Sequence, residues 1–154
     1  MGMLMFRRFL ILIAFSILIV AGCGDSGPKM ARVEGTVTYD GKPLSAATII
    51  FTPESGARMG EGGTDEQGHY YLGTYKIDDG AIVGKHRVAV VKRGPHRSPP
   101  KGTPGWGVGP GGPVLAGPPL IAERFLQTET SGLSADVEDR RKNVIDFELK
   151  SDED

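Results

Sequence analysis

The sequence predicts an all-β fold: a single antiparallel β-sandwich of about seven strands, behind an apolar N-terminal segment. Short segments in which apolar and polar residues alternate recur along the chain, and turn-forming residues separate them. After the N-terminal segment no stretch has a clear 3.6-residue hydrophobic period, although residues 122–127 have room for one helical turn. Short strands separated by turn signals are typical of β-sandwiches.

The first predicted strand covers residues 32–39. Its odd-numbered residues are apolar or small and its even-numbered residues are polar, which predicts a half-buried strand. Asp40-Gly41 follows directly, and this pair is the strongest short hairpin signal because both residues tolerate a positive φ. The buried face of this strand is expected to carry Val33, Gly35, Val37 and Tyr39.

The second predicted strand covers residues 47–52, with Ala47, Ile49 and Phe51 on one side, and Pro53 ends it. Residues 55–63 are rich in glycine and polar residues, so any strand there is expected at a sheet edge.

The next segment predicts a turn followed by a strand. Residues 64–68 form the turn, in which Asp65 is placed to accept hydrogen bonds from the backbone ahead of it. Residues 69–72 continue as a strand that buries Tyr70 and Leu72.

Three further strands are predicted after this turn. Residues 86–92 form one, and residues 133–137 and 144–149 form the last two. We expect residues 138–143 to join these last two strands as a hairpin, and residues 151–154 to be a solvated acidic tail. The inward-facing residues are predicted to be Val88, Val90, Leu133, Ala135, Val137, Ile145, Phe147 and Leu149.

Residues 94–119 interrupt the strand pattern. They hold eight of the 11 prolines and eight glycines, around the single Trp106. Because proline lacks the backbone donor and glycine loses entropy on ordering, we predict a mobile insertion that does not pair as sheet. Trp106 either contacts a partner, by stacking on a sugar or docking a protein, or folds back over an open end of the sandwich.

The N-terminal segment has the organisation of an export signal. Residues 1–8 carry Arg7 and Arg8 without an acidic residue, and the apolar run 9–21 that follows is 13 residues long. A membrane-spanning helix needs about 20 apolar residues. Residues 1–22 are therefore predicted to be a signal peptide.

Val20-Ala21-Gly22-Cys23 ends this segment and resembles the lipobox of bacterial lipoproteins. The resemblance implies a diacylglyceryl group on the Cys23 sulfur, cleavage before Cys23, and acylation of the new α-amine by a fatty acid such as palmitate. Residues 23–30 then form a lipidated tether. The alternative is a free thiol, because the chain has no second cysteine for an intramolecular disulfide. Gly24, rather than aspartate, after the cysteine favours the outer membrane, facing the periplasm or the cell surface.

The charge of the exported part limits its partners. Removing residues 1–22 from 154 leaves 132, in which Lys+Arg falls from 18 to 16 against 19 Asp+Glu, a net charge of −3. Mild acidity argues against a nucleic-acid partner, which would be met by a basic patch. The length suits one domain with a modest core, predicted over residues 31–150.

Several of these segments together resemble the carboxypeptidase regulatory-like domain. That resemblance implies a transthyretin-like, or prealbumin-like, β-sandwich with an accessory role, and it transfers no catalytic residue. Together with the lipobox and the C-terminal segments, it is similar to small lipoproteins of planctomycete bacteria. The segments that carry the two resemblances are 33–44, 47–51, 64–70 and 84–88, then 130–133 and 143–149.

No metal site or cofactor is expected. The three histidines, His69, His86 and His96, fall on different predicted elements and offer no short-range ligand pair. Four acidic residues in turns could gather around Ca²⁺. We favour the simpler interpretation that they build turns. These four are Asp65, Glu66, Asp78 and Asp79.

Other motifs are weaker still. Residues 107–112 resemble a phosphate-binding loop, but Pro110 and Pro113 exclude the helix start that such a loop needs. Asn143, the only asparagine, suggests an isopeptide bond to a lysine, and its expected position in a turn argues against it. No serine lies in a motif that supplies a catalytic base.

The sequence thus predicts a non-enzymatic binding or structural module of the bacterial cell envelope, anchored to a membrane through lipid on Cys23. Its expected partner is an envelope protein or a glycan. The two alternatives are a carbohydrate-binding surface module that uses Trp106, and an envelope hydrolase.

Overall fold

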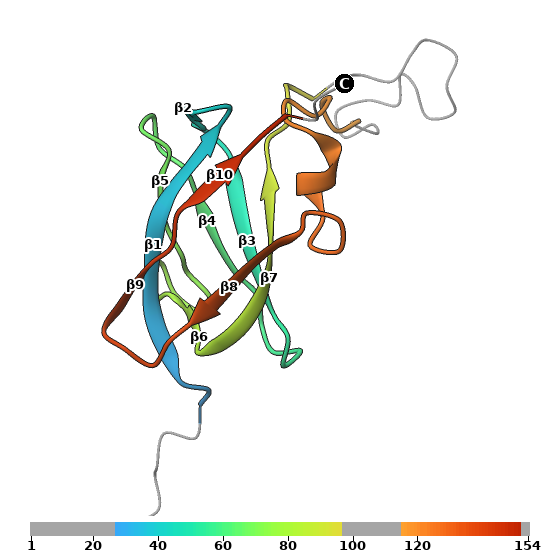
Figure 1. Cartoon of the computed structure of the whole chain (residues 1–154). Coiled ribbons are helices and arrows are strands. Elements are labelled where there is room, and N and C mark those ends of the chain that lie inside the picture. Colours follow the sequence, from blue (N-terminus) through green and yellow to red (C-terminus); the bar gives the residue numbers. More distant parts are fainter. Residues whose placement is uncertain (1–26, 97–114, 152–154) are drawn as a thin grey trace, which may run out of the picture.

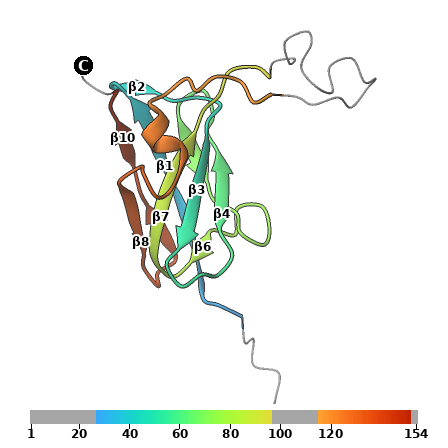
Figure 2. The ribbon, with the colours of Figure 1, turned by 90° about the vertical axis from the view of Figure 1, so that its right-hand side faces the viewer.

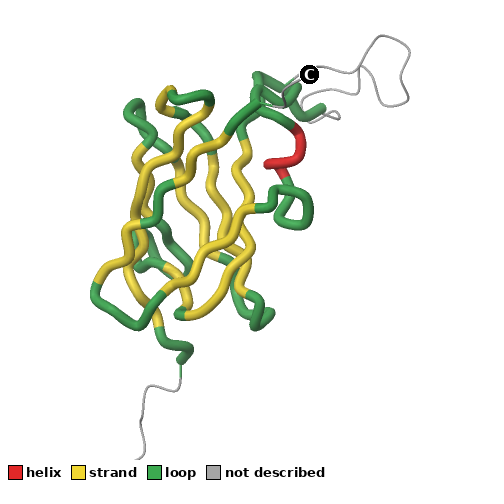
Figure 3. The backbone as a smooth tube through the Cα atoms, viewed as in Figure 1, coloured by secondary structure: helices red, strands yellow, loops and turns green. Residues whose placement is uncertain are grey.

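The computed structural model describes residues 27–96 and 115–151, which form an all-β domain (Figure 1). Two sheets face each other across one core, and the all-β class predicted from the sequence is confirmed. The only helical segment within the described residues is a 3-10 turn, η1 (Glu123–Leu126), which falls inside the range expected to hold one turn (Figure 3). The strands are β1 (Met30–Tyr39), β2 (Lys42–Pro43), β3 (Thr48–Pro53), β4 (Gly60–Gly63), β5 (His69–Tyr71), β6 (Ala81–Ile82), β7 (Gly84–Val91), β8 (Leu133–Val137), β9 (Lys142–Val144) and β10 (Phe147–Leu149).

The first sheet is built around β1, whose partners change along its length. β5 and β2 pair with it antiparallel, and β6 pairs antiparallel near its N-terminal end. On its other edge β9 and β10 pair with it in parallel. Val33 and Val37 are buried as predicted. The Asp40-Gly41 hairpin is confirmed, since φ is 51° at Asp40 and 75° at Gly41, as a tight β-turn requires.

The second sheet is antiparallel, in the order β4-β3-β7-β8. Ile49 lies opposite Val90 and Phe51 opposite Val88, and all four side chains are buried in the core. β4 lies at the edge of this sheet, as expected for the glycine-rich segment that contains it. The alternation of apolar residues therefore predicted the buried face of this sheet correctly.

The two sheets approach each other where β4 contacts β5. Figure 2 shows β4 beside β3 at the edge of the second sheet. Isolated bridges join Glu61 to Gly73 and Thr64 to Tyr70, so β4 continues irregularly into the first sheet. Gly62 lies between these bridges, where a β-carbon would be 2.3 Å from the carbonyl oxygen of Tyr71. The strands can approach this closely because residue 62 has no side chain.

The expected hairpin between the last two long strands is wrong. β8 pairs with β7 in the second sheet, whereas β9 and β10 pair with β1 in the first, so the connection after Val137 crosses between sheets. Asn143, expected in the turn, lies on β9 and is 0 % exposed. Alternation identifies the buried face of a strand but carries no information about which strand lies next to it.

Part of the Gly/Pro-rich insertion is also paired, contrary to our prediction. Residues 92–94 and 118–120, which we call the neck, are joined by a bridge between Arg93 and Pro119. The amide of Gly94 donates to the carbonyl of Pro118 at 2.8 Å, and the amide of Leu120 donates to Lys92 at 3.0 Å. Pro118 takes part because only its carbonyl is needed, so its missing donor does not matter.

Residues 1–22, predicted to be a signal peptide, lie outside the described residues, as do Cys23 and residues 152–154 of the predicted acidic tail. Within the described ranges, no helix has the length and apolar character needed to cross a membrane.

Candidate binding surface

Two adjoining hollows lie on the outside of the domain, one on each side of Tyr71. The first has a volume of about 450 Å³ and the second about 340 Å³, and Tyr71 lines both. The first lies between β4 and the loop after β5, and the second lies over β1, β5 and β9. Their other lining residues include Glu61, Gly62, Gly63, Tyr75, Lys76, Ile77 and Asp78 in the first, and Glu34, Thr36, His69, Val144 and Asp146 in the second.

Tyr71 points outward because of the strand period. Its neighbours Tyr70 and Leu72 are fully buried in the core, so the side chain between them lies on the opposite face. Tyr71 is 56 % exposed. No hydrogen bond to its hydroxyl is made within the described part of the chain.

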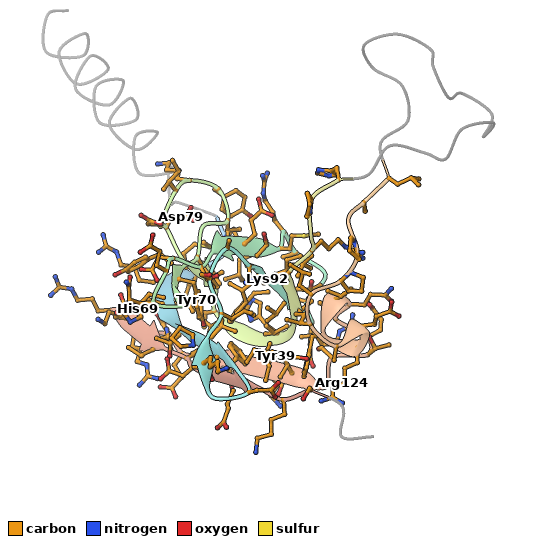
Figure 4. All side chains as sticks on the ribbon, turned by 90° about the horizontal axis from the view of Figure 1, so that it is seen from above. Tyr39, His69, Tyr70, Asp79, Lys92 and Arg124 are labelled. Carbon is orange, nitrogen blue, oxygen red and sulfur yellow. The ribbon has the colours of Figure 1, made fainter. Side chains whose placement is uncertain are left out.

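The loop that follows β5 is held in shape by one carboxylate. Asp79 accepts hydrogen bonds from the amides of Thr74 at 2.7 Å, Tyr75 at 3.1 Å and Lys76 at 2.9 Å. The Thr74 hydroxyl also donates to the carbonyl of Gly80 at 2.7 Å. Asp79 and His69 lie on the same side of the domain, away from Arg124 on η1 (Figure 4). The loop is therefore held in shape by hydrogen bonds between its own residues.

This loop presents two further large apolar side chains. Tyr75 is 51 % exposed, and the Arg58 guanidinium carbon lies 5.6 Å from its ring centre, which holds the ring in place. Ile77 is 92 % exposed. We call Tyr71, Tyr75 and Ile77, with the flanking polar residues Glu61, Lys76 and Asp78, the tyrosine surface.

The second hollow owes its shape to the interruption between β9 and β10. There the Asp146 carboxylate accepts hydrogen bonds from both the amide and the hydroxyl of Thr36, each at 2.7 Å. The preceding carbonyl, of Ile145, turns inward and accepts the Tyr70 hydroxyl at 2.6 Å. Burial raises the pKa of Tyr70, so this hydroxyl stays protonated and remains a donor.

His86 is the one histidine buried in the core within the described residues. Its ring packs against Phe51, with 5.7 Å between ring centres, and its Nδ1 lies 2.9 Å from the carbonyl oxygen of Gly84, to which it donates. Burial lowers the pKa of His86, while the Gly84 carbonyl and the carboxylates of Asp136 and Glu54 act in the opposite direction.

The structure separates the histidines considered as metal ligands. His69 lies on β5 and His86 on β7, in different sheets, and His96 is exposed just beyond the neck. Across residues 27–96 and 115–151, no group of three or more His, Cys, Asp or Glu side chains is arranged to hold a metal ion. Three features considered from the sequence lie outside the described ranges: Trp106, the predicted lipobox Val20 to Cys23, and residues 107–112.

The turn-building role is confirmed for Asp65 and Asp79. Asp65 accepts the amides of Gln67 at 2.9 Å and His69 at 2.8 Å, and Asp79 organises its loop as described above. The carboxylates of Asp65 and Asp79 are therefore already used by the backbone of two separate turns.

The buried side-chain amide of Asn143 forms four hydrogen bonds. Its Oδ1 accepts the amide of Glu138 at 3.1 Å and the Nε of Arg140 at 3.0 Å. Its Nδ2 donates to the carbonyls of Glu138 at 3.1 Å and Arg32 at 3.4 Å. The turn position expected for Asn143, which argued against an isopeptide bond, is wrong, because the residue lies on β9. The amide instead joins β9 to the end of β8 as a peptide group would.

Comparison with protein-family models, with curated proteins and with solved structures finds no match for this chain. The class defined by the geometry is thus an all-β, two-sheet domain with an ordered, tyrosine-bearing outer surface.

The tyrosine surface was not predicted from the sequence. The alternation that buried Tyr70 and Leu72 already placed Tyr71 outside, so that part of the signal was available. Tyr75 and Ile77 gave no such signal, because they lie in a loop whose shape depends on Asp79. His86 and Asn143 were missed as buried polar residues for a similar reason: a hydrophobic pattern does not mark them.

Proposed function

We propose that this chain is an exported lipoprotein of the bacterial envelope, anchored through lipid on Cys23, and that its all-β domain is a non-enzymatic binding module. Residues 1–22 are removed as the signal peptide in this proposal. The membrane is one partner, through the lipid, and an envelope protein or glycan is the other.

The observation that carries the proposal is that residue 27 and the neck lie at opposite ends of the domain. The described chain starts at Gly27, at one end of the domain, and β1 runs from there to the opposite end, where the neck lies (Figures 1 and 2). Residues 23–29 span at most about 25 Å when extended. Lipid on Cys23 would hold one end of the domain near the membrane and leave the neck pointing away from it.

The surroundings of the two strand histidines support a binding role over catalysis. The Nδ1 of His86 donates a hydrogen bond to the Gly84 carbonyl. The Nδ1 of His69 lies 3.7 Å from the Asp65 carboxylate, and the two form an ion pair when the ring is protonated. Neither contacts a hydroxyl that could act as a nucleophile, within the described residues. A screen of the purified protein against esters, peptides and glycosides tests this: turnover that resists further purification would contradict it.

We further propose that the domain is of the carboxypeptidase regulatory-like, transthyretin-like type. In support, the Asp40-Gly41 hairpin and the Asp65–Gly68 turn, which carry much of the resemblance, are both formed. The two sheets around one core are consistent with that fold. An experimental structure with a different strand order would contradict this part of the proposal.

Metabolic labelling tests the anchor. Cells that express the chain are grown with a fatty-acid analogue, and the wild type is compared with Cys23→Ala. Labelled wild-type protein in the membrane fraction and unlabelled Cys23→Ala protein are expected. Ser26→Ala, a small change three residues further on in the tether, should label like the wild type. Equal label in wild type and Cys23→Ala would show that the anchor is wrong.

Density-gradient separation of the two membranes tests the location. Wild-type protein is expected in the outer-membrane fraction, since Gly24 follows the cysteine. Gly24→Asp is expected to move it to the inner membrane. Unchanged distribution of the variant would contradict the basis of this assignment.

A further inference from the structure

We propose that the tyrosine surface binds a linear, uncharged or amino-sugar glycan chain, which lies across Tyr71 from the first hollow into the second. The inference deepens the proposed binding function and rests on it only for the class of module. It assigns a site different from the Trp106 site considered from the sequence.

The aromatic rings supply the apolar part of recognition. One face of a pyranose ring is lined by C–H groups, which stack on an aromatic ring, while the sugar hydroxyls remain free at the ring edge. Tyr71 and Tyr75 are both about half exposed although each is anchored at its backbone, one by a strand and one by the Asp79-organised loop. Because the backbone that carries both rings is already fixed, binding orders only side-chain torsions.

The groups around the rings supply the polar part. The side chains of Glu61, Lys76 and Asp78 line the first hollow, and none forms a hydrogen bond or ion pair within the described residues. The hydroxyls of Tyr71 and Tyr75 are likewise without partners there. Donors and acceptors placed beside a stacking ring match the edge of a sugar, which presents both.

The sizes of the hollows favour a chain over a compact ligand. At about 450 and 340 Å³, each is at the lower end of the range of about 300–1,000 Å³ typical of ligand pockets. They share Tyr71 as a lining residue, so a chain that crosses this ring would reach both hollows. A polymer of stacked rings uses both hollows, whereas a single small molecule fills only one.

The charge of the lining limits the class of glycan. Carboxylates from Glu61 and Asp78 line the first hollow with Lys76, and those of Glu34 and Asp146 line the second. Two further cations contact this lining, because Lys142 pairs with Glu34 at 2.7 Å and Arg58 lies over the Tyr75 ring. With four carboxylates against three cations, the surface offers no excess positive charge to a uronate, phosphate or sulfate. Neutral sugars and amino sugars therefore suit this surface.

A peptide is the main competing occupant, and the backbone argues against it. An extended peptide gains affinity by pairing with a free strand edge. Beside the first hollow this edge is used, because the amide of Glu61 donates to Gly73 and the amide of Gly73 donates back to Glu61, each at 2.9 Å. A proline-rich peptide needs no strand edge, so it must be separated by experiment.

Affinity electrophoresis of the full chain in detergent tests the proposal. The gels contain a neutral polysaccharide (hydroxyethyl cellulose or xylan), glycol chitosan as an amino-sugar polymer, or polygalacturonate as an anionic polymer. A proline-rich peptide is tested by fluorescence polarisation. The variants are Tyr71→Ala, Tyr75→Ala, their combination, and Ile77→Lys as a second route that changes only an exposed side chain. Leu120→Ala, which truncates another half-exposed apolar residue on the neck, is the control.

Retardation of the wild type by at least one neutral or amino-sugar polymer is expected. Each tyrosine variant should weaken it about fivefold, the effect of losing one aromatic stack. The combination should abolish it, and Leu120→Ala should leave it unchanged. No retardation by any polymer, unchanged retardation in the double variant, equal binding of polygalacturonate, or binding of the peptide alone would each overturn the proposal. None of these outcomes bears on Cys23, so the anchor stands or falls separately by labelling.

Discussion

Replacing Asn143 with alanine should destabilise the domain more than any exposed substitution near it. The side chain is fully buried and makes four hydrogen bonds, three of them to backbone groups of Glu138 and Arg32. A buried backbone group left without a partner costs about 1–3 kcal/mol. These groups are only partly buried, so we take about 1 kcal/mol for each and expect a loss of about 3 kcal/mol.

The loss is measured by urea unfolding followed by circular dichroism. A shift of the midpoint with an unchanged slope is expected, together with a decrease in Tm of about 12 °C, at about 4 °C per kcal/mol for a domain of this size. Asn143→Asp keeps the shape and the acceptors but loses both donors and sets a carboxylate against two carbonyls, so it should cost at least as much as alanine.

Val144→Ala is the matched control. Val144 is the next residue on β9 and is 57 % exposed, so its truncation should change the free energy of unfolding by no more than about 0.5 kcal/mol. If Asn143→Ala costs less than about 1 kcal/mol, or no more than Val144→Ala, the amide does not join the strands in the way described.

Two further substitutions test the interior. Gly35→Ala would place a β-carbon 1.9 Å from the carbonyl oxygen of Ile145, so it should lower the free energy of unfolding in urea by about 3 kcal/mol or more. The control is Gly63→Ala, which has nothing within 4 Å and should lower it by less than about 1 kcal/mol. Similar losses in the two variants would contradict the close approach at Gly35. Burial lowers the pKa of His86 in the folded chain. The unfolded chain therefore binds a proton at about pH 6.5, where the folded chain does not. The free energy of unfolding should therefore be fully maintained above about pH 6.5 and fall as the pH is lowered to 5. The fall should be smaller in His86→Gln, and an identical pH dependence in both proteins would show that His86 does not contribute.

The buried faces of the strands could be predicted from the sequence because they follow from local alternation. Phe51 and Val88 are each two residues from another buried side chain, Ile49 and Val90, as the two-residue period of a strand predicts. The turns at Asp40 and Asp65 were predictable because the side chain or the φ preference acts within four residues. Each of these features is decided by residues close together in the chain.

The strand partners could not be predicted in this way. β9 pairs with β1 across more than one hundred residues, and nothing in the alternation of residues 144–149 distinguishes this partner from β8. The tyrosine surface was likewise not predictable, since the loop that carries Tyr75 and Ile77 lies beside β4 through a single bridge between Glu61 and Gly73. The pairing of strands that are far apart in the chain thus could not be predicted from the sequence.

Single polar side chains complete the pairing where the regular ladders stop. Asp146 accepts the amide of Thr36 where β9 gives way to β10, and Asn143 joins the ends of β8 and β9. In both places a side-chain oxygen takes the part of a backbone carbonyl, so the ladder can be interrupted without leaving an amide unpaired. A hydrophobic pattern does not mark these two residues, although their hydrogen bonds join the strands that meet there. Asn143 lines neither hollow, so Asn143→Ala should lower the free energy of unfolding without changing the tyrosine surface, whereas Asp146 lines the second hollow and a substitution there should affect both.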